Sequence, residues 1–207
     1  MKIKTSPLGN MGANFYMVTC EETNELFVVD PGACADVAID LIKDSGAQLK
    51  YIILTHAHAD HIGALDSVKA VYDVPVVICS EENDALNNDT YNLCSMFGMH
   101  SPKTTADICV SDGDTLPFGN GEIRFLHTPG HTKGSMCIHF ENCLISGDTL
   151  FYGSIGRTDF PGGSFKEIEK SIVEKIYSLD SNTMIYPGHG NPTSVKFEMK
   201  NNPFVHR

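Results

Sequence analysis

The apolar segment Tyr51–Leu54 is followed directly by a dense run of polar side chains, Thr55-His56-Ala57-His58-Ala59-Asp60-His61. Imidazole and carboxylate groups suit divalent ions such as zinc, iron and manganese. A catalytic tetrahedral metal needs only about three ligands from the protein. This one short turn already offers three histidines and an aspartate, which is more than a single metal needs. The run therefore predicts a cofactor of two divalent metal ions, with zinc expected and iron or manganese as alternatives.

Strand and helix patterns alternate around this run. Residues 14–20 and 25–30 are rich in β-branched and aromatic side chains and predict a hairpin. Hydrophobic periodicity then predicts a helix, a strand, a helix and a strand, at Ala35–Ser45, Lys50–Thr55, Ala59–Tyr72 and Val74–Cys79. The histidine run thus lies on a strand-to-helix turn, and Asp60 and His61 open the second helix. This succession is typical of layered α/β structure.

The second half of the chain has a similar organisation. Residues 84–99 lack a clear periodicity and predict short helices or a flap. From Ile108 onward the strand patterns resume, and they are followed by a helix at 165–179 and a last strand at 184–186. Both halves run from strands into helices, which indicates two similar layers packed face to face.

The composition fits one enzyme domain over residues 1–207, without a linker. A chain of 207 residues with 42% hydrophobic content can bury a full core. The net charge of −11, without a lysine or arginine cluster longer than a pair, argues against a nucleic-acid partner. No signal peptide or membrane-spanning stretch is recognisable, so we expect a cytoplasmic protein without a membrane partner. The seven scattered cysteines are expected to be reduced and mostly buried.

Glycine-flanked polar residues stand at three later strand ends. The segments are Thr128-Pro129-Gly130-His131-Thr132, Ser146-Gly147-Asp148-Thr149 and Tyr186-Pro187-Gly188-His189-Gly190. A lone histidine or aspartate at a strand end is more often a hydrogen-bonding residue than a metal ligand. Here the glycine beside each polar residue lets the backbone turn tightly, so that the side chain can point into a shared cleft. Together with the first run, these residues predict further ligands of one metal centre.

The motifs Thr-His-x-His-x-Asp-His, Pro-Gly-His-Thr, Gly-Asp and Gly-His-Gly, in this order, resemble the metallo-β-lactamase superfamily. The resemblance implies an α/β fold, the αββα sandwich of two mixed β-sheets flanked by helices, with the metals at one edge. It also implies a ligand set: His56, His58 and His131 for the first metal, Asp60, His61 and His189 for the second, and Asp148 bridging both. Asp30 would orient a ligand without binding a metal.

Two stretches carry a closer likeness to short glyoxalase II-like, or hydroxyacylglutathione hydrolase-like, enzymes: Gly153–Phe160, and Pro187–Gly190 with Asn201–Phe204. The likeness implies that the chain lacks the C-terminal helical substrate domain of longer glyoxalase II enzymes. It implies that Arg157 meets the thiol-carrier part of the substrate. Asp159 stands where the long enzymes have a tyrosine, which puts glutathione itself in question as the carrier. Asp159, Tyr152 and Phe160 are further candidates for substrate contact, the last two at the mouth of the site.

We expect a binuclear metal-dependent hydrolase that cleaves a small-molecule thioester, such as a hydroxyacyl-glutathione-like substrate. Two metals about 3.5–4 Å apart hold a bridging water whose pKa falls toward about 7, and the metal-bridging hydroxide attacks the thioester carbonyl. Asp60 and Asp148 are the catalytic carboxylates in this hypothesis. The absence of a Gly-x-Ser-x-Gly motif agrees with a mechanism that needs no protein nucleophile. We expect a monomer or a homodimer.

Two other functions stay open. Persulfide dioxygenases resemble the chain through the first histidine motif and the Gly-Arg-Thr-Asp-Phe stretch, so a mononuclear iron oxidoreductase of that kind is the alternative. Those enzymes typically have Asp-Tyr after the last histidine, where this chain has Gly190-Asn191. The third hypothesis is a non-catalytic metal-binding module. Seven ligands argue against it, because structural zinc is usually closed and four-coordinate.

Overall fold

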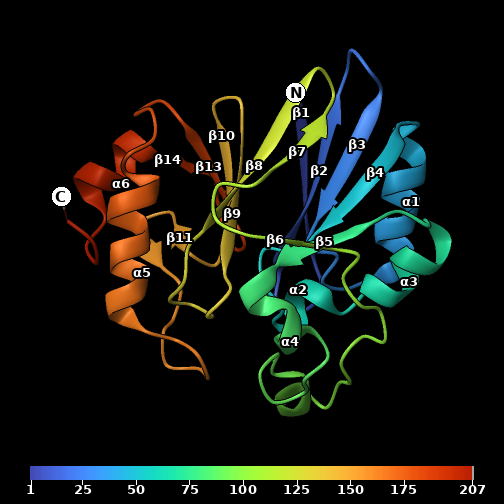
Figure 1. The fold of residues 1–207 in the computed structure, drawn as a ribbon, viewed down its shortest axis with the longest axis horizontal. Helices are drawn as coiled ribbons and strands as arrows, with labels where there is room; N and C mark the ends of the chain where they lie inside the picture. Colours follow the sequence, from blue (N-terminus) through green and yellow to red (C-terminus); the bar gives the residue numbers. More distant parts are fainter. Residues whose placement is uncertain (207) are drawn as a thin grey trace.

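The computed structural model describes residues 1–206 and contains two six-stranded β-sheets that face each other (Figure 1). The first sheet has its strands in sequence order: β1 (Lys2–Leu8), β2 (Ala13–Cys20), β3 (Glu25–Val29), β4 (Gln48–Ile53), β5 (Val76–Cys79) and β6 (Ile108–Val110). Strands β1, β2 and β3 are antiparallel neighbours, whereas β3, β4, β5 and β6 pair in parallel. The sheet is therefore mixed, as expected.

The second sheet has the strand order β14-β13-β10-β9-β8-β7. Its strands are β7 (Thr115–Phe118), β8 (Gly121–His127), β9 (Met136–Phe140), β10 (Cys143–Gly147), β13 (Met184–Pro187) and β14 (Thr193–Ser194). Strands β10 and β13 pair in parallel and the other neighbours are antiparallel. A separate small hairpin consists of β11 (Leu150–Phe151) and β12 (Ser154–Ile155).

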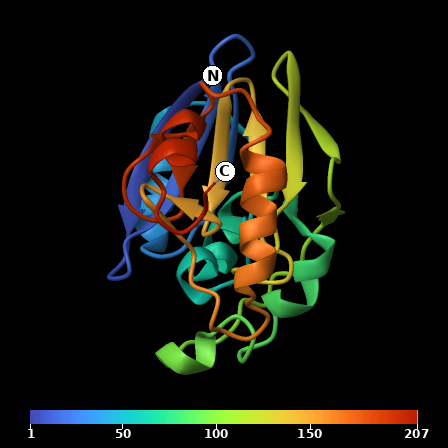
Figure 2. The same cartoon turned by 90° about the vertical axis from the view of Figure 1, so that its left-hand side faces the viewer.

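Helices cover the outer faces of both sheets. The α-helices are α1 (Ala35–Ser45), α2 (Ala59–Ile62), α3 (Leu65–Val71), α4 (Asn83–Leu86), α5 (Phe165–Ser171) and α6 (Val195–Asn201). Shorter 3₁₀ turns are η1 (Ser80–Glu82) and η2 (Cys94–Phe97), and a π-helical turn, η3 (Ile172–Ile176), continues α5. Figure 1 shows α1 and α3 outside the first sheet, and Figure 2 shows α5 and α6 in front of the second. The αββα sandwich is thus confirmed.

Alternation along the central strands builds this layering, because successive side chains of a strand point to opposite faces of the sheet. In β4, Ile52 packs in the cluster under α1 and α3, whereas Ile53 packs in the cluster between the two sheets. Between the sheets, the ring of Phe27 meets Phe118 and Phe140 edge to face, at centroid distances of 4.8 and 5.5 Å. Strands buried on both faces explain the continuous apolar runs in the sequence.

The helix predicted over residues 59–72 is wrong in one respect, because the chain breaks between α2 and α3. Gly63 packs tightly at this break, and a Cβ added there would lie 2.4 Å from the carbonyl oxygen of Gly32. The backbone N–H of Ala64 donates to the carbonyl of Pro31 at 2.9 Å instead of continuing the helix. This contact holds α2, which carries two of the predicted ligands, against the end of β3.

Two further predictions concern the cysteines and membrane-spanning helices. All seven cysteines are free thiols, and four of them are buried, at positions 20, 79, 94 and 137. The prediction that most of the cysteines are buried is therefore confirmed. None of the helices in residues 1–206 is long and apolar enough to cross a membrane.

Candidate metal centre

The predicted ligands come from both sheets and meet at one edge of the sandwich. His56 and His58 lie in the loop that leaves β4, and Asp60 and His61 lie in α2 directly after it. The second sheet supplies its ligands from the loop after β8 and from the ends of β10 and β13, at His131, Asp148 and His189. The two halves of the fold therefore contribute to the same site.

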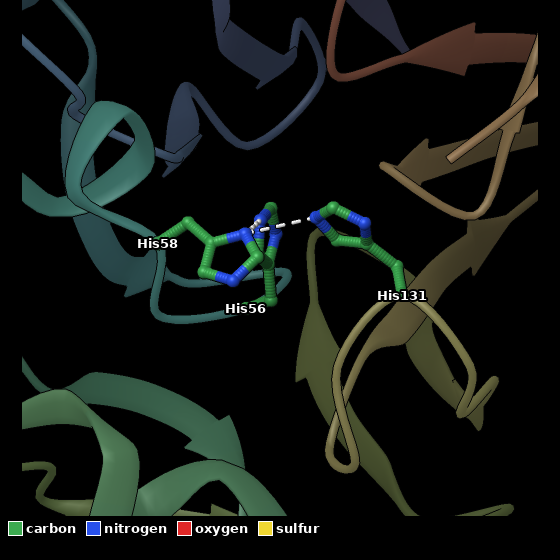
Figure 3. Close-up of side chains that lie close together, drawn as sticks. All are labelled: His56, His58 and His131. Atoms are coloured by element: carbon green, nitrogen blue, oxygen red, sulfur yellow. Dashed lines mark hydrogen bonds between the residues drawn. The ribbon is translucent and has the colours of Figure 1, made fainter. Parts of the chain in front are cut away.

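The first ligand set, formed by His56, His58 and His131, converges on a single point (Figure 3). The distance from His56 Nε2 to His58 Nδ1 is 3.1 Å, and that from His131 Nε2 to His58 Nδ1 is 2.9 Å. All three side chains are buried. Three imidazole nitrogens at such separations match the three protein ligands of a catalytic zinc or iron ion.

The outer nitrogens of His56 and His131 are held by the protein. His131 Nδ1 lies 2.8 Å from the carbonyl oxygen of Arg157, which can only accept, so Nδ1 carries the proton and the Nε2 lone pair points inward. His56 Nδ1 lies 3.1 Å from Thr55 Oγ1. Burial and neighbouring imidazoles keep the pKa of His56 well below its usual value, and burial lowers the pKa of His58 to about 3. Neutral imidazole is the form that binds metals.

The second ligand set is formed by Asp60, His61 and His189. Asp60 Oδ2 lies 3.2 Å from His189 Nε2 and 3.7 Å from His61 Nε2. His61 Nδ1 donates to Asp30 Oδ2 at 2.8 Å, which leaves Nε2 directed toward the site. Burial acts to lower the pKa of His61, but Asp148 and Asp30 outweigh it and raise the pKa to about 10. Three carboxylates therefore surround the imidazole of His61, and this half of the centre is suited to a cation.

Asp30 supports this second set from behind, as a residue that orients a ligand. It is buried and takes a left-handed backbone conformation, with φ of 53°. Its Oδ1 accepts from the backbone N–H of Thr55 at 2.7 Å, and its Oδ2 accepts from the Thr55 hydroxyl at 2.6 Å. The carboxylate thus connects the loop of the first ligand set with His61 in α2. Left-handed backbone in a residue other than glycine is uncommon and is often found at functional sites.

Asp148 lies between the two ligand sets. Its Oδ2 is 3.5 Å from His131 Nε2 and 3.7 Å from His189 Nε2, and its Oδ1 is 3.4 Å from His61 Nε2. Gly188 is required beside it, because a Cβ at that position would lie 2.1 Å from Asp148 Oδ1. One carboxylate therefore reaches ligands of both sets, which is the position of a bridging ligand.

Unsatisfied polar atoms test whether these residues fit a metal. Within residues 1–206, the buried side-chain atoms that lack any hydrogen-bond partner are His58 Nε2, His61 Nε2 and Asp148 Oδ1. All three belong to this centre. Buried polar atoms without partners are costly, and a divalent cation in the second ligand set would satisfy His61 Nε2 and Asp148 Oδ1, which both face the centre. The donor set, the geometry and the orphaned atoms together fit two divalent ions.

A cavity of about 380 Å³ opens over these ligands. Six apolar side chains line it: Met11, Leu93, Phe97, Phe151, Ile155 and Phe160. Sequence reasoning named Phe160 among these and missed the others as substrate contacts. The aromatic and methionine content of residues 84–99 was a signal for Phe97, but such side chains more often pack in a core. No sequence pattern marks Met11.

The predicted substrate contacts are not all brought to the cavity. Arg157 and Phe160 line it, and the Arg157 guanidinium lies over the Phe160 ring, 3.8 Å from its centroid. Arg157 Nε and Nη2 each donate to an oxygen of Asp159 at 2.7 Å, and this arginine lowers the pKa of Asp159 to about 2. Asp159 and Tyr152 are not among the residues that line the cavity, and Tyr152 stacks on Phe197 at a centroid distance of 4.8 Å.

Two relatives match the chain over nearly its whole length. The probable metallo-hydrolase YqgX of Bacillus subtilis (strain 168) is 36% identical over 208 residues, which covers 99% of this chain and 98% of YqgX. The hydroxyacylglutathione hydrolase GloC of Haemophilus influenzae (strain ATCC 51907 / DSM 11121 / KW20 / Rd) is 31% identical over 211 residues. That match covers 99% of this chain and 98% of GloC.

Two solved structures have closely similar folds. The BLEG-1 B3 metallo-beta-lactamase superposes with a TM-score of 0.93 at 36% identity, over 99% of both chains. TTHA1623 in a di-iron-bound form superposes with a TM-score of 0.87 at 30% identity, over 98% of this chain and 100% of that protein. Residues 8–189 match the family model of the metallo-beta-lactamase superfamily. This match spans every predicted metal ligand, and the chain belongs to the metallo-β-lactamase superfamily.

Proposed function

We propose that the protein is a binuclear metal-dependent hydrolase that cleaves thioesters. The observation that carries the proposal is the position of Asp148, whose oxygens lie 3.4 to 3.7 Å from histidines of both ligand sets. A carboxylate between two ligand sets is what a pair of neighbouring divalent ions requires. Zinc is the metal we propose. The similarity to a protein in a di-iron-bound form makes iron the first alternative to test.

When bound, the two ions would supply Lewis acidity and would lower the pKa of a water molecule toward about 7. The residues of the chain then orient the metal ligands and accept the proton that the water loses. Asp30 and the main-chain carbonyl of Arg157 orient the histidines that they contact. The side chains of Asp60 and Asp148 both line the cavity, where Asp148 would hold the two ions together and the free oxygen of Asp60 could accept a proton from water. A thiolate leaves readily without a protein acid.

The cavity supports a thioester as the substrate. Its apolar walls offer contact area for an acyl chain or for the apolar part of a thiol carrier. Arg157 is the cation at the wall of the cavity, but Asp159 occupies two of its nitrogens and balances its charge. This pairing favours carriers that are weakly charged over strongly anionic ones. The similarity to the hydroxyacylglutathione hydrolase GloC supports thioester cleavage itself.

A panel of substrates tests the proposal. Protein of measured metal content should hydrolyse a glutathione thioester and a small neutral thioester far above the uncatalysed rate, and should act poorly on a persulfide and on a β-lactam. Oxygen consumption with the persulfide at one iron per chain would replace the proposal with the iron oxidoreductase. Faster cleavage of the β-lactam than of either thioester would replace it with a lactamase.

A further inference from the structure

Glu82 is a buried carboxylate that contacts the metal-ligand loops of both sheets. It ends the 3₁₀ turn after β5, and only 2% of its surface is exposed. Its Oε1 accepts from the backbone N–H of Ala57 at 3.0 Å, and its Oε2 accepts from the Thr132 hydroxyl and the Gly134 N–H, both at 2.9 Å. No lysine or arginine within residues 1–206 forms an ion pair with it.

The partners of Glu82 stand directly beside the first ligand set. Ala57 lies between the two histidines of the loop after β4, and Thr132 follows His131 in the loop after β8. Each carboxylate oxygen thus binds one of the two loops. Because β4 and β8 belong to different sheets, this side chain is a direct polar connection between the two halves of the histidine site.

The loop after β8 is shaped to receive this carboxylate. Gly134 packs against Glu82 so closely that an added Cβ would lie 2.3 Å from its backbone nitrogen. Thr132 is fixed in turn by Ser135, whose Oγ accepts from the Thr132 N–H at 3.0 Å. A buried carboxylate pays a large desolvation cost, which is offset only when its hydrogen bonds are complete. An apolar side chain would fill this position at lower cost if packing alone were needed.

We propose that Glu82 is a positioning residue for the metal site of His56, His58 and His131. By binding one loop with each oxygen, it sets the separation between histidines that come from different sheets. Groups that orient metal ligands typically contribute about 10- to 100-fold in metal affinity. The inference depends on the metal centre and is independent of the substrate, so failure of thioester hydrolysis would leave it intact.

Glu198 in α6 provides a matched control. It is fully buried, and it accepts from the Gly153 N–H at 3.1 Å, the Thr193 hydroxyl at 2.6 Å and Asn202 Nδ2 at 2.8 Å. None of these partners is a predicted ligand or a neighbour of one in the sequence. Both glutamates are therefore buried and accept hydrogen bonds from similar donors, but only Glu82 connects the two ligand loops.

The experiment compares Glu82→Gln with Glu198→Gln. In either variant an amide nitrogen replaces an acceptor oxygen, so at least one donor loses its partner. Zn²⁺ affinity is measured by competition with a chromophoric chelator, and the visible spectrum of the Co²⁺-loaded protein reports ligand geometry. We expect Glu82→Gln to weaken Zn²⁺ binding by about 10- to 100-fold and to change the Co²⁺ spectrum. Glu198→Gln should lower the unfolding temperature and leave both metal readouts unchanged.

Thr132→Val keeps the experiment decisive if Glu82→Gln does not fold, because it removes only one hydroxyl donor to Glu82. It should weaken Zn²⁺ binding in the same direction by a smaller factor. Wild-type Zn²⁺ affinity and an unchanged Co²⁺ spectrum in a folded Glu82→Gln protein would overturn the proposal. Equal losses of affinity in the two glutamine variants would also overturn it, since a general loss of stability would then be the cause.

Discussion

At the scale of single residues, the Asp148 side chain determines whether the two ligand sets act together. Its Oδ2 faces His131 and its Oδ1 faces His61, at 3.5 and 3.4 Å from the respective Nε2 atoms. Within residues 1–206, Oδ1 is one of the few buried polar atoms without a hydrogen-bond partner. The side chain contributes nothing to the apolar clusters that build the sandwich. Its chemical role and the stability of the fold can therefore be separated.

We predict that Asp148→Ala lowers thioester hydrolysis by at least about 100-fold, or about 2.7 kcal/mol of transition-state stabilisation. The far-UV circular dichroism spectrum should stay that of the wild type. Asp73→Ala is the control, because the side chain of Asp73 is fully exposed and Asp73 is not one of the predicted metal ligands. Turnover is compared at equal metal content. Near-normal turnover of metal-loaded Asp148→Ala would rule out the bridging role.

Arg157 allows substrate recognition to be separated from chemistry. Its guanidinium lines the cavity but is held by Asp159 and Phe160. We predict that Arg157→Ala raises KM for a glutathione thioester by several-fold, with a smaller change in kcat and little effect on a neutral thioester. Arg124→Ala is the control, because Arg124 is an exposed residue of β8, and it should change the kinetics of neither substrate. Equal losses on both substrates would contradict a role in recognition.

The predicted metal ligands could be found from the sequence because each stands in a motif at a strand end. The residues that form the walls of the cavity could not be found from the sequence. Leu93 and Phe97 reach the site from an irregular segment whose path depends on tertiary packing, and Met11 lies between two strands with no motif around it. Glu82 was also missed, since an isolated glutamate in a turn gives no sign that it will be buried.

At the scale of elements, local signals were most reliable where a helix has clear ends. Helix α1 spans residues 35–45 as predicted, because Gly46 takes the left-handed conformation that ends it. Strand β1 was missed, since only Leu8 of its seven residues is buried and the apolar pattern is correspondingly weak. Helix α6 was missed as well, although Ser194 caps it by accepting from the Phe197 N–H. The break between α2 and α3 depends on a tertiary contact of Gly63.

Gly63 gives the test at this scale. Its φ of −63° is compatible with any residue, so steric contacts alone oppose a side chain, and the closest of them is the Gly32 carbonyl oxygen at 2.4 Å. We predict that Gly63→Ala lowers the free energy of unfolding by about 1–3 kcal/mol through overpacking. Gly121→Ala is the matched control, since a Cβ there meets nothing within 4 Å. Urea denaturation measures both. Equal stability of the two variants would show that the α2–α3 break tolerates a side chain.

At the scale of the whole molecule, the metal centre joins the two halves of the sandwich. The first sheet and its helix supply four of the predicted ligands and the second sheet supplies three, at His56, His58, Asp60 and His61, and at His131, Asp148 and His189. The layered fold could be predicted because strands and helices alternate in both halves of the sequence. Which loops meet could not be derived from periodicity, because that depends on how the sheets face each other (Figure 1).

The central claim is that both ligand sets bind a metal and that the pair is needed for hydrolysis. The direct measurement is a titration of metal-free protein with Zn²⁺, in which bound metal and thioester hydrolysis are followed together. We predict that binding saturates near two ions per chain and that hydrolysis rises mainly with the second. Saturation at one ion per chain with full activity at that point would contradict the claim. The absence of thioester hydrolysis at every metal loading would also contradict it.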